Sequence, residues 1–314
     1  MQNIEYLSFQ GGGIHGIYYV GVCKYLEDHN LLTNLKGVSG SSIGSLFALL
    51  FAMKLKYEDM KNIVSELDFD KVIGLNAFDE IKALYKIINN FGILSRKNLE
   101  KAVSEILIKY CGDKNITFIE FYNKFNIELN VCITNVNKMQ SVFVSHKTDP
   151  DYKVLDIVCI SMSVPIYFET SIINDEYYCD GSVLCNLPLK IWDTENNKAN
   201  TFGIIVVSPE QLDNNSTPIN SIDDYMFNII GNLNGKASEI YYKDPVTRKI
   251  DSRVCQIVTD IPFLNNNLTE SNIENMIING YNSTSHFFQS KDNMYSIDFK
   301  RKINNNNTYY CNLL

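Results

Sequence analysis

One serine of this chain stands in a pattern that could make it a nucleophile. Residues 37–44 read Gly-Val-Ser-Gly-Ser-Ser-Ile-Gly, and only Ser42 has a glycine two residues before it and two residues after it, Gly40 and Gly44. Between a strand and a helix, Gly-x-Ser-x-Gly is typical of a sharp turn that exposes the serine oxygen. The free N–H groups of the helix N-terminus then favour developing negative charge. Alone the pattern is weak, because a serine that caps an ordinary strand–helix turn looks the same.

A glycine-rich segment, Gly11-Gly12-Gly13-Ile14-His15-Gly16, precedes that turn and admits three interpretations. Its glycine spacing matches a dinucleotide-binding fingerprint, but that site needs an acidic residue at the end of the second strand, and residues 38–40 are Val-Ser-Gly. The glycines could instead serve tight packing only. In the third interpretation the N–H groups of Gly12, Gly13 and Ile14 form an oxyanion hole, with about 3 kcal/mol of transition-state stabilisation per donor. The position one strand before Ser42 favours this interpretation.

A serine nucleophile needs a proton acceptor, and Asp180 is the best candidate. Asp180 ends an apolar strand and is followed at once by Gly181 and Ser182. An aspartate with a pKa of about 3.9 is a weak base toward a hydroxyl. We therefore expect Asp180 to be partly desolvated and the oxyanion donors to supply much of the transition-state stabilisation. A strand-end Asx turn would use the same residue without catalysis.

The four histidines are weaker candidates for the base. His29 ends a helix in a charged stretch and His146 lies in a polar loop, so both are expected at the surface. His286 lies late in the last predicted helix and would complete the chain order Ser42, Asp180, His286 of α/β-hydrolases. A histidine on an apolar helix face is more often a core or surface residue, so this triad remains an alternative.

The elements that must position these residues alternate at the start of the chain. Strands are expected at 4–9 and 35–38 and helices at 17–28 and 43–54, an order that predicts a parallel sheet in an α/β fold. Further strands are expected at 127–134, 140–145, 177–179, 201–208 and 253–259. Further helices are expected at 57–67, 77–89, 95–109, 154–161, 222–242 and 271–288, with a short one after the capping box of Thr117 and Glu120.

We expect residues 1–314 to form a single domain, because no internal repeat and no long linker divides the chain. Residues 191–314 would complete the sheet and the helical layers, and the tail at about 290–314 would be loose. Residues 69–94 could form a lid or a plain helical layer over the sheet. Residues 261–264 could be an apolar loop that dips into lipid or a strand end packed in the core.

Composition excludes several classes of protein. The net charge of −8 argues against nucleic-acid binding. The eight cysteines form no Cys-x-x-Cys pair, so neither a zinc site nor a redox motif is indicated, and the setting would be reduced. No metal and no cofactor is expected. The first residues lack a signal-peptide pattern, and the longest apolar run, 43–53, is too short for a transmembrane segment. We therefore expect a cytoplasmic protein.

Taken together, three motifs in this order resemble the patatin-like phospholipase family. They are the glycine segment 11–16, the serine turn 40–44 and Asp180-Gly181-Ser182, with Asn-Leu-Pro following at 186–188. The stretch Ser-Met-Ser-Val-Pro at 161–165 also fits, and the resemblance spans about residues 4–190. It implies a three-layer α/β/α fold with a mostly parallel central sheet, and a Ser–Asp dyad without histidine. By this resemblance Ser42 is the nucleophile, Asp180 the base and the glycine segment the oxyanion hole.

The family hydrolyses acyl esters of phospholipids, galactolipids or neutral glycerolipids and needs no metal for the chemistry. Two positions depart from its pattern: His15 stands where Arg or Lys is usual, and Ser182 stands where Gly or Ala is usual. Neither removes a reacting group. We therefore predict a phospholipase A-type hydrolase that forms an acyl-enzyme on Ser42 and associates peripherally with a membrane surface that holds its lipid substrate. The second alternative is a catalytically dead module that binds lipid or a partner.

Overall fold

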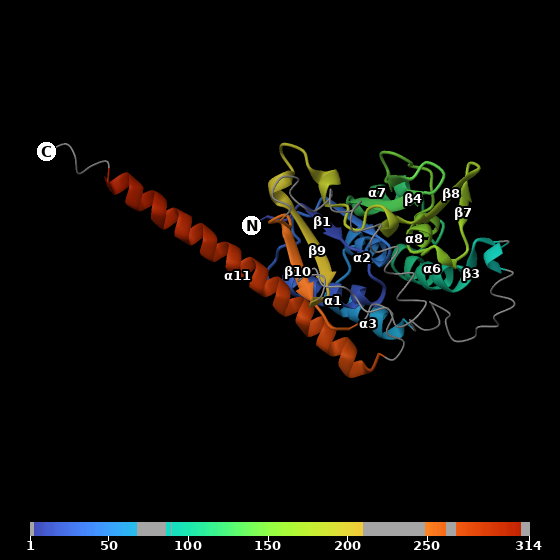
Figure 1. The fold of residues 1–314 in the computed structure, drawn as a ribbon, viewed down its shortest axis with the longest axis horizontal. Coiled ribbons are helices and arrows are strands. Elements are labelled where there is room, and N and C mark those ends of the chain that lie inside the picture. Colours follow the sequence, from blue (N-terminus) through green and yellow to red (C-terminus); the bar gives the residue numbers. More distant parts are fainter. Residues whose placement is uncertain (1–2, 68–85, 89, 210–248, 262–267, 309–314) are drawn as a thin grey trace.

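The two strand–helix units at the start of the chain lie at the centre of the sheet in this computed structural model (Figure 1). Strand β1 (Tyr6–Phe9) leads through a 3-10 helix, η1 (Gly13–Ile17), into α1 (Tyr18–Asp28). Strand β2 (Gly37–Ser41) leads directly into α2 (Ile43–Ala52). The structure describes residues 3–67, 86–88, 90–209, 249–261 and 268–308, the last of these with side chains to residue 290.

An eight-stranded sheet organises the described residues. Its order is β10-β9-β1-β2-β4-β8-β7, with β5 paired to β4 outside this path. The strands β10, β9, β1, β2 and β4 run parallel, whereas β5, β8 and β7 add antiparallel pairs, so the sheet is mostly parallel. The further strands are β4 (Glu128–Asn135), β5 (Gln140–Val144), β7 (Ser171–Ile173), β8 (Glu176–Asp180), β9 (Thr201–Val207) and β10 (Val254–Val258). A separate parallel pair joins β3 (Gly92–Leu94) and β6 (Ile166–Phe168).

Helices pack against this sheet: α2 contacts β1, β2 and β4, and α11 contacts β10. The further helices are α3 (Tyr57–Glu66), α6 (Lys97–Cys111), α7 (Phe118–Phe125), α8 (Val154–Ser161) and α11 (Glu270–Thr308). Three short 3-10 helices follow Asp180, namely η2 (Gly181–Val183), η3 (Leu189–Trp192) and η4 (Lys198–Asn200). The capping box of Thr117 and Glu120 at the start of α7 is confirmed. The fold is the α/β class that the sequence predicts.

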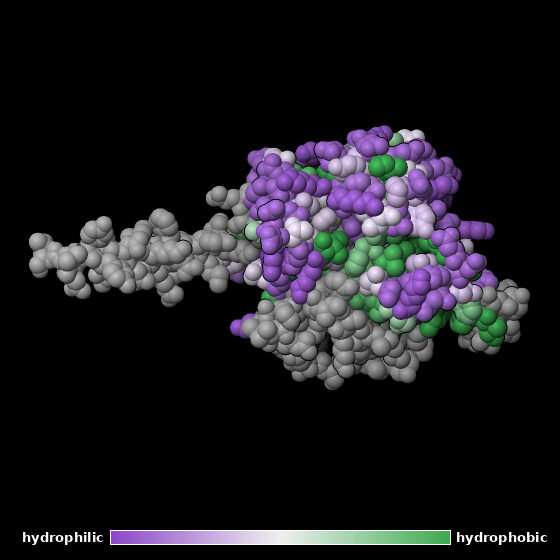
Figure 2. Space-filling model, turned by 90° about the horizontal axis from the view of Figure 1, so that it is seen from above, coloured by the Kyte–Doolittle hydropathy of each residue, from purple (hydrophilic) through white to green (hydrophobic). Residues whose placement is uncertain are grey.

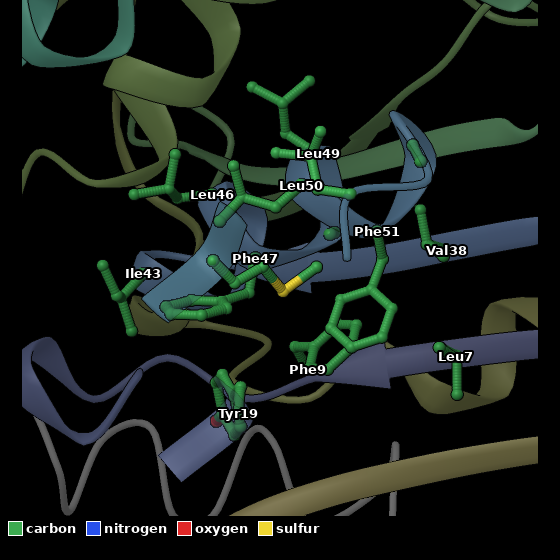
Figure 3. Packing of buried hydrophobic residues seen from close by; sticks show 14 of the residues in the cluster. Leu7, Phe9, Tyr19, Val38, Ile43, Leu46, Phe47, Leu49, Leu50 and Phe51 are labelled. Atoms are coloured by element: carbon green, nitrogen blue, oxygen red, sulfur yellow. The ribbon is translucent and has the colours of Figure 1, made fainter. Parts of the chain in front are cut away.

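The alternation of side chains along β1 separates the two faces of the sheet. Phe9 faces the helices, with ring centroids 4.8 Å from Phe51 of α2 and 5.2 Å from Tyr19 of α1 (Figure 3). Tyr6 faces the other way and stacks on Trp192 of η3 at 4.8 Å. The opposite face is therefore covered, in the part of the chain that is described, by the segment that follows the Asp-Gly motif.

Helix α2 is the most deeply buried helix of the site region. All ten of its residues are buried, and Figure 3 shows Phe47 and Phe51 directed toward Tyr19 and Phe9. A helix that is apolar on every side has no face suited to water, so it is stable only inside the core. This burial fixes the start of α2, and with it the position of Ser42.

The C-terminal part of the chain supplies one edge of the sheet and the longest helix. Strands β9 and β10 form that edge, and α11 packs on α1 through Tyr25, which contacts Tyr281 and Phe288. We expected this helix to end at 288. Instead α11 continues to Thr308 and projects away from the sheet (Figure 1), since no proline or glycine follows Gly280 to stop it.

Several expectations fall on segments that are not described. Two predicted helices lie wholly or nearly wholly outside the described residues, namely 222–242 and 77–89. The same holds for most of the suggested lid at 69–94 and most of the apolar loop 261–264. No helix in the described part is both long and apolar enough to cross a bilayer. Figure 2 shows one face of the molecule, where hydrophilic residues predominate and hydrophobic residues gather in a smaller central area.

Candidate active site

Ser42 occupies a sharp turn between β2 and α2. Its backbone angles are φ 52° and ψ −132°, which a residue with a side chain rarely adopts, and only 7% of its surface is exposed. Although Ser42 is the N-cap residue of α2, its side chain makes no capping hydrogen bond. The ordinary capping role is therefore wrong for this serine, and strain of this kind is characteristic of a nucleophile turn.

The two flanking glycines let the chain fold back on itself at this turn. A Cβ atom on Gly40 would lie 2.1 Å from the carbonyl oxygen of Gly44, and one on Gly44 would lie 2.4 Å from the carbonyl oxygen of Phe9. Neither position can hold a side chain without moving the backbone. The glycine spacing seen in the sequence thus reflects the close passage of α2 over the ends of β1 and β2.

Strand register brings Ser42 to Asp180. Ser41 at the end of β2 pairs with Cys132 of β4, and the next residue of β4, Ile133, pairs with Asp180 of β8. The hydroxyl of Ser42 donates a hydrogen bond to Oδ2 of Asp180 at 2.7 Å. The parallel pairing with β2 therefore gives way to the antiparallel pairing with β8 between Cys132 and Ile133 of β4, and two residues 138 positions apart become direct partners.

Asp180 is fully buried and its other oxygen is also occupied. Oδ1 accepts one hydrogen bond from the N–H of Ser182 at 2.8 Å and another from its hydroxyl at 2.7 Å. The N–H contact is an Asx turn. Asp180 therefore forms the strand-end Asx turn and also contacts Ser42. Burial raises the pKa of Asp180 to about 6, against the lowering effect of the hydrogen bonds from Ser42 and Ser182.

Ser161, which the sequence did not single out, supports the turn from α8. Its hydroxyl accepts a hydrogen bond from the N–H of Ser42 at 3.0 Å and donates one to the carbonyl oxygen of Cys132 at 2.6 Å. The only sequence signal was its place at the start of the Ser-Met-Ser-Val-Pro stretch. Ser161 ties the backbone of Ser42 to β4, the strand that also carries the pairing with Asp180.

The glycine segment passes directly beside Ser42. A Cβ atom on Gly11 would lie 2.8 Å from the Cβ of Ser42. The N–H of Gly11 is already used, because it donates to the side-chain and main-chain oxygens of Asn186 at 3.0 and 3.2 Å. Among the described residues, the N–H groups of Gly12 and Gly13 have no acceptor. The oxyanion role of the segment stays a prediction, and its candidate donors are the main-chain N–H groups that follow Gly11.

His15 and Gly16 hold the glycine segment in place. The N–H of His15 donates to the carbonyl oxygen of Gly12 at 3.1 Å, and its Nε2 lies 2.7 Å from the carbonyl oxygen of Ile261. Burial lowers the pKa of His15, so the ring is neutral near pH 7 and Nε2–H is the donor to Ile261. Gly16 lies against Ile43 and Phe47 of α2, where a Cβ would approach their side chains to 2.6 and 2.7 Å.

The other histidines lie elsewhere. His286 is exposed on α11, although the sequence made it the candidate for a third triad member. His29 contacts the carbonyl oxygen of Tyr25, and His146 stacks on Tyr122. The partners of the Asp180 carboxylate among the described residues are Ser42 and Ser182, so no histidine takes part in this contact.

Comparisons with known proteins place the chain in a family. The model of the family described as patatin-like phospholipase matches residues 7–192, which is more than half of the chain. Uncharacterized protein R571 of Acanthamoeba polyphaga mimivirus is 27% identical over 273 residues, which are 84% of this chain and 87% of that protein. Probable lipid hydrolase 463L of Invertebrate iridescent virus 6 is 27% identical over 197 residues, 62% of this chain and 65% of that protein.

A solved structure supports the same fold. The crystal structure of VipD from Legionella pneumophila aligns with 92% of this chain and 67% of its own, with a TM-score of 0.60 and 17% identity. At that identity the likeness concerns the fold alone. The family match covers all three motifs found in the sequence. This chain therefore belongs to the patatin-like phospholipase family.

Proposed function

We propose that this protein is a lipid acyl hydrolase in which Ser42 is the nucleophile and Asp180 its base. The observation that carries the proposal is the 2.7 Å hydrogen bond from the Ser42 hydroxyl to a fully buried carboxylate. Membership of the patatin-like phospholipase family and the similarity to a probable lipid hydrolase support a lipid ester as the substrate.

The reaction begins with attack of the Ser42 oxygen on the carbonyl carbon of the ester. As the O–C bond forms, the serine proton passes to Oδ2 of Asp180, and negative charge develops on the former carbonyl oxygen. The tetrahedral intermediate expels the alcohol, which takes the proton from Asp180, and the acyl group remains on Ser42. Water then attacks this acyl-enzyme, Asp180 accepts a proton from the water, and the same proton returns to Ser42 as the fatty acid leaves.

The glycine segment would stabilise the developing charge. The N–H groups of Gly12 and Gly13 lie in the loop beside Ser42 and have no acceptor among the described residues. Each such donor would contribute about 3 kcal/mol to the transition state. Because the neutral His15 and Asn186 hold the two ends of this loop, the donors would not need to reorganise during the reaction.

The environment of Asp180 suits a base. An aspartate at its ordinary pKa of about 3.9 has little tendency to take a serine proton. Burial raises the pKa of Asp180 to about 6, closer to neutral pH, where it is still mostly ionised and binds a proton more readily. The Asp180 carboxylate is thus mostly ionised at neutral pH and is a stronger base than an ordinary aspartate.

The direct test is release of fatty acid from phospholipid vesicles by the purified protein. A panel of phospholipids and neutral glycerolipids, with products identified by mass spectrometry, would define the substrate. Wild-type protein should release fatty acid, and Ser42→Ala and Asp180→Asn should lose nearly all of this activity. Equal release by wild type and Ser42→Ala would refute the proposal.

The triad alternative and the inactive-module alternative have separate tests. His286→Ala should keep the wild-type rate, because this side chain is exposed on α11 and absent from the contacts of Asp180. A fluorophosphonate probe should label wild-type protein at Ser42 and leave Ser42→Ala unlabelled. Absence of labelling in a folded wild-type protein would favour a module that only binds lipid or a partner.

A further inference from the structure

Ser182 makes a contact that the usual residues at its position cannot make. Its hydroxyl donates to Oδ1 of Asp180 at 2.7 Å, in addition to the N–H contact at 2.8 Å. Glycine or alanine at this position would supply the N–H but not the hydroxyl. Ser182, which departs from the family pattern, therefore contacts the proposed base directly.

The hydrogen bonds on Asp180 are divided between its two oxygens. Both contacts from Ser182 reach Oδ1, and the contact from Ser42 reaches Oδ2. The N–H of Asp180 is also fixed, since it donates to the carbonyl oxygen of Ser163 at 3.0 Å. With two donors on Oδ1, rotation of the carboxylate away from Ser42 would break two charge-assisted hydrogen bonds at once.

We propose that the Ser182 hydroxyl is a positioning group that holds Oδ1 of Asp180 and thereby directs Oδ2 toward Ser42. The inference rests on the proposed function, in which Asp180 is the base. It assigns Ser182 an effect through Asp180, with no contact to substrate. The serine at this position is then an additional support for the base.

A second consequence concerns the proton affinity of the base. A hydroxyl that donates to a carboxylate stabilises the ionised form. Loss of the Ser182 hydroxyl should therefore raise the pKa of Asp180 further, by about one unit, as expected for one hydrogen bond to a charged group. A larger fraction of the protein would then be protonated, and inactive, at neutral pH.

The test is a titration that needs no substrate. Protein labelled with ¹³C at the aspartate carboxyl carbons is titrated by NMR, and the Asp180 signal is assigned by its absence in Asp180→Asn. The variants are Ser182→Ala, Ser182→Thr, which keeps a hydroxyl, and Ser163→Ala as the matched control. The hydroxyl of Ser163 donates to the carbonyl oxygen of Cys159 at 2.6 Å and does not contact the carboxylate.

The expected result is an Asp180 midpoint about one pH unit higher in Ser182→Ala, and a wild-type midpoint in Ser182→Thr and Ser163→Ala. The acid limb of fatty-acid release should move by the same amount. An unchanged midpoint in a folded Ser182→Ala protein would overturn the inference. Lack of lipid hydrolysis by wild-type protein would count against the proposed function instead, and the titration would still decide the role of Ser182.

Discussion

The main-chain N–H of Ser42 donates to the hydroxyl of Ser161, 3.0 Å away. Ser161 is the last residue of α8 and is fully buried. As the N-cap residue of α2, Ser42 has an N–H that the helix cannot satisfy, and its backbone is strained. The hydroxyl of Ser161 accepts a hydrogen bond from this N–H and donates its own O–H to the carbonyl oxygen of Cys132 in β4. The strained turn is thus held from a second element of the fold.

We expect Ser161→Ala to lower both stability and activity. The change leaves the buried N–H of Ser42 without an acceptor, which costs about 1–3 kcal/mol. Ser42, the proposed nucleophile, would also be less well positioned, and we expect kcat to fall about tenfold, equivalent to about 1.4 kcal/mol. Urea unfolding measures the stability, the rate of fatty-acid release measures kcat, and fluorophosphonate labelling measures the reactivity of Ser42.

The matched control for this variant is Ser163→Ala, two residues along the chain. Its hydroxyl donates to Cys159 within the preceding turn, so its loss leaves the N–H of Ser42 satisfied. The control should label Ser42 faster than Ser161→Ala does. Equal labelling rates in the two variants would contradict a specific role for the Ser161 hydroxyl.

The pH dependence of activity should report the proton affinity of Asp180. As the proposed base, Asp180 must be ionised to accept the serine proton, and burial raises its pKa to about 6. Activity should therefore fall as the pH drops through about 6, well above the value of about 3.9 for an ordinary aspartate. The measurement is kcat/KM across pH 4–9 on a neutral ester. An acid limb near 4 would mean that the base is solvated or is a different group.

Asp180→Asn should separate activity from stability. Because Asp180 binds its proton more tightly in the folded state than in the unfolded chain, its ionisation opposes folding. This destabilisation is absent below about pH 4 and fully present above about pH 6. The neutral asparagine avoids it, so this variant, which the proposed mechanism makes inactive, should be more stable than wild type at pH 8, by at most about 3 kcal/mol.

Urea unfolding at two pH values tests this prediction. The stability difference between Asp180→Asn and wild type should be clear at pH 8 and should shrink toward zero at pH 4, where the carboxyl is protonated in the folded state and about half protonated in the unfolded chain. A variant that is less stable than wild type at pH 8 would show that the amide disrupts the hydrogen bonds from Ser42 and Ser182 more than it relieves burial of charge.

Local signals predicted the parts of the site that depend on local geometry. The glycines at 40 and 44 indicated the turn, because a sharp return of the chain leaves no room for a Cβ there. The strand leading into that turn was expected at 35–38 but runs Gly37–Ser41. Its glycines and serines do not resemble a strand, yet all five residues are buried, since α2 and η3 pack closely on its two sides.

Contacts between distant residues could not be read in the same way. Asn186 holds Gly11 from 175 positions away, and Ser161 holds Ser42 from 119 positions away. Both residues lie in stretches that fit the family pattern, but the pattern does not name their partners, because one polar side chain in a buried position meets its partner only through the strand register. The short strands β3 and β6 were missed for a related reason: three residues are too few to show an alternation.

Arg253 illustrates the same limit and leads to a prediction for the part of the chain without motifs. Its side chain is 6% exposed and lies between Asp193, after η3, and Asp251, before β10. Two of its nitrogens contact Asp193 at 2.5 and 3.2 Å, and Nε and Nη2 contact Asp251 at 2.9 and 2.7 Å. This ion network joins the sheet edge formed by β10 to the segment with η3, which covers the face of the sheet opposite to α1 and α2.

Removal of this cation should destabilise the fold without changing the chemistry at Ser42. Arg253→Ala leaves two carboxylates close together without their partner, and breaking such a pair costs about 3–5 kcal/mol. Arg253→Lys keeps the charge but lacks the planar fork, so it should recover only part of the loss. Urea unfolding gives the stabilities, and fluorophosphonate labelling at low temperature gives the reactivity of the folded fraction. Wild-type stability in Arg253→Ala would show that the network is dispensable, and a lower labelling rate in folded protein would connect this edge to the active site.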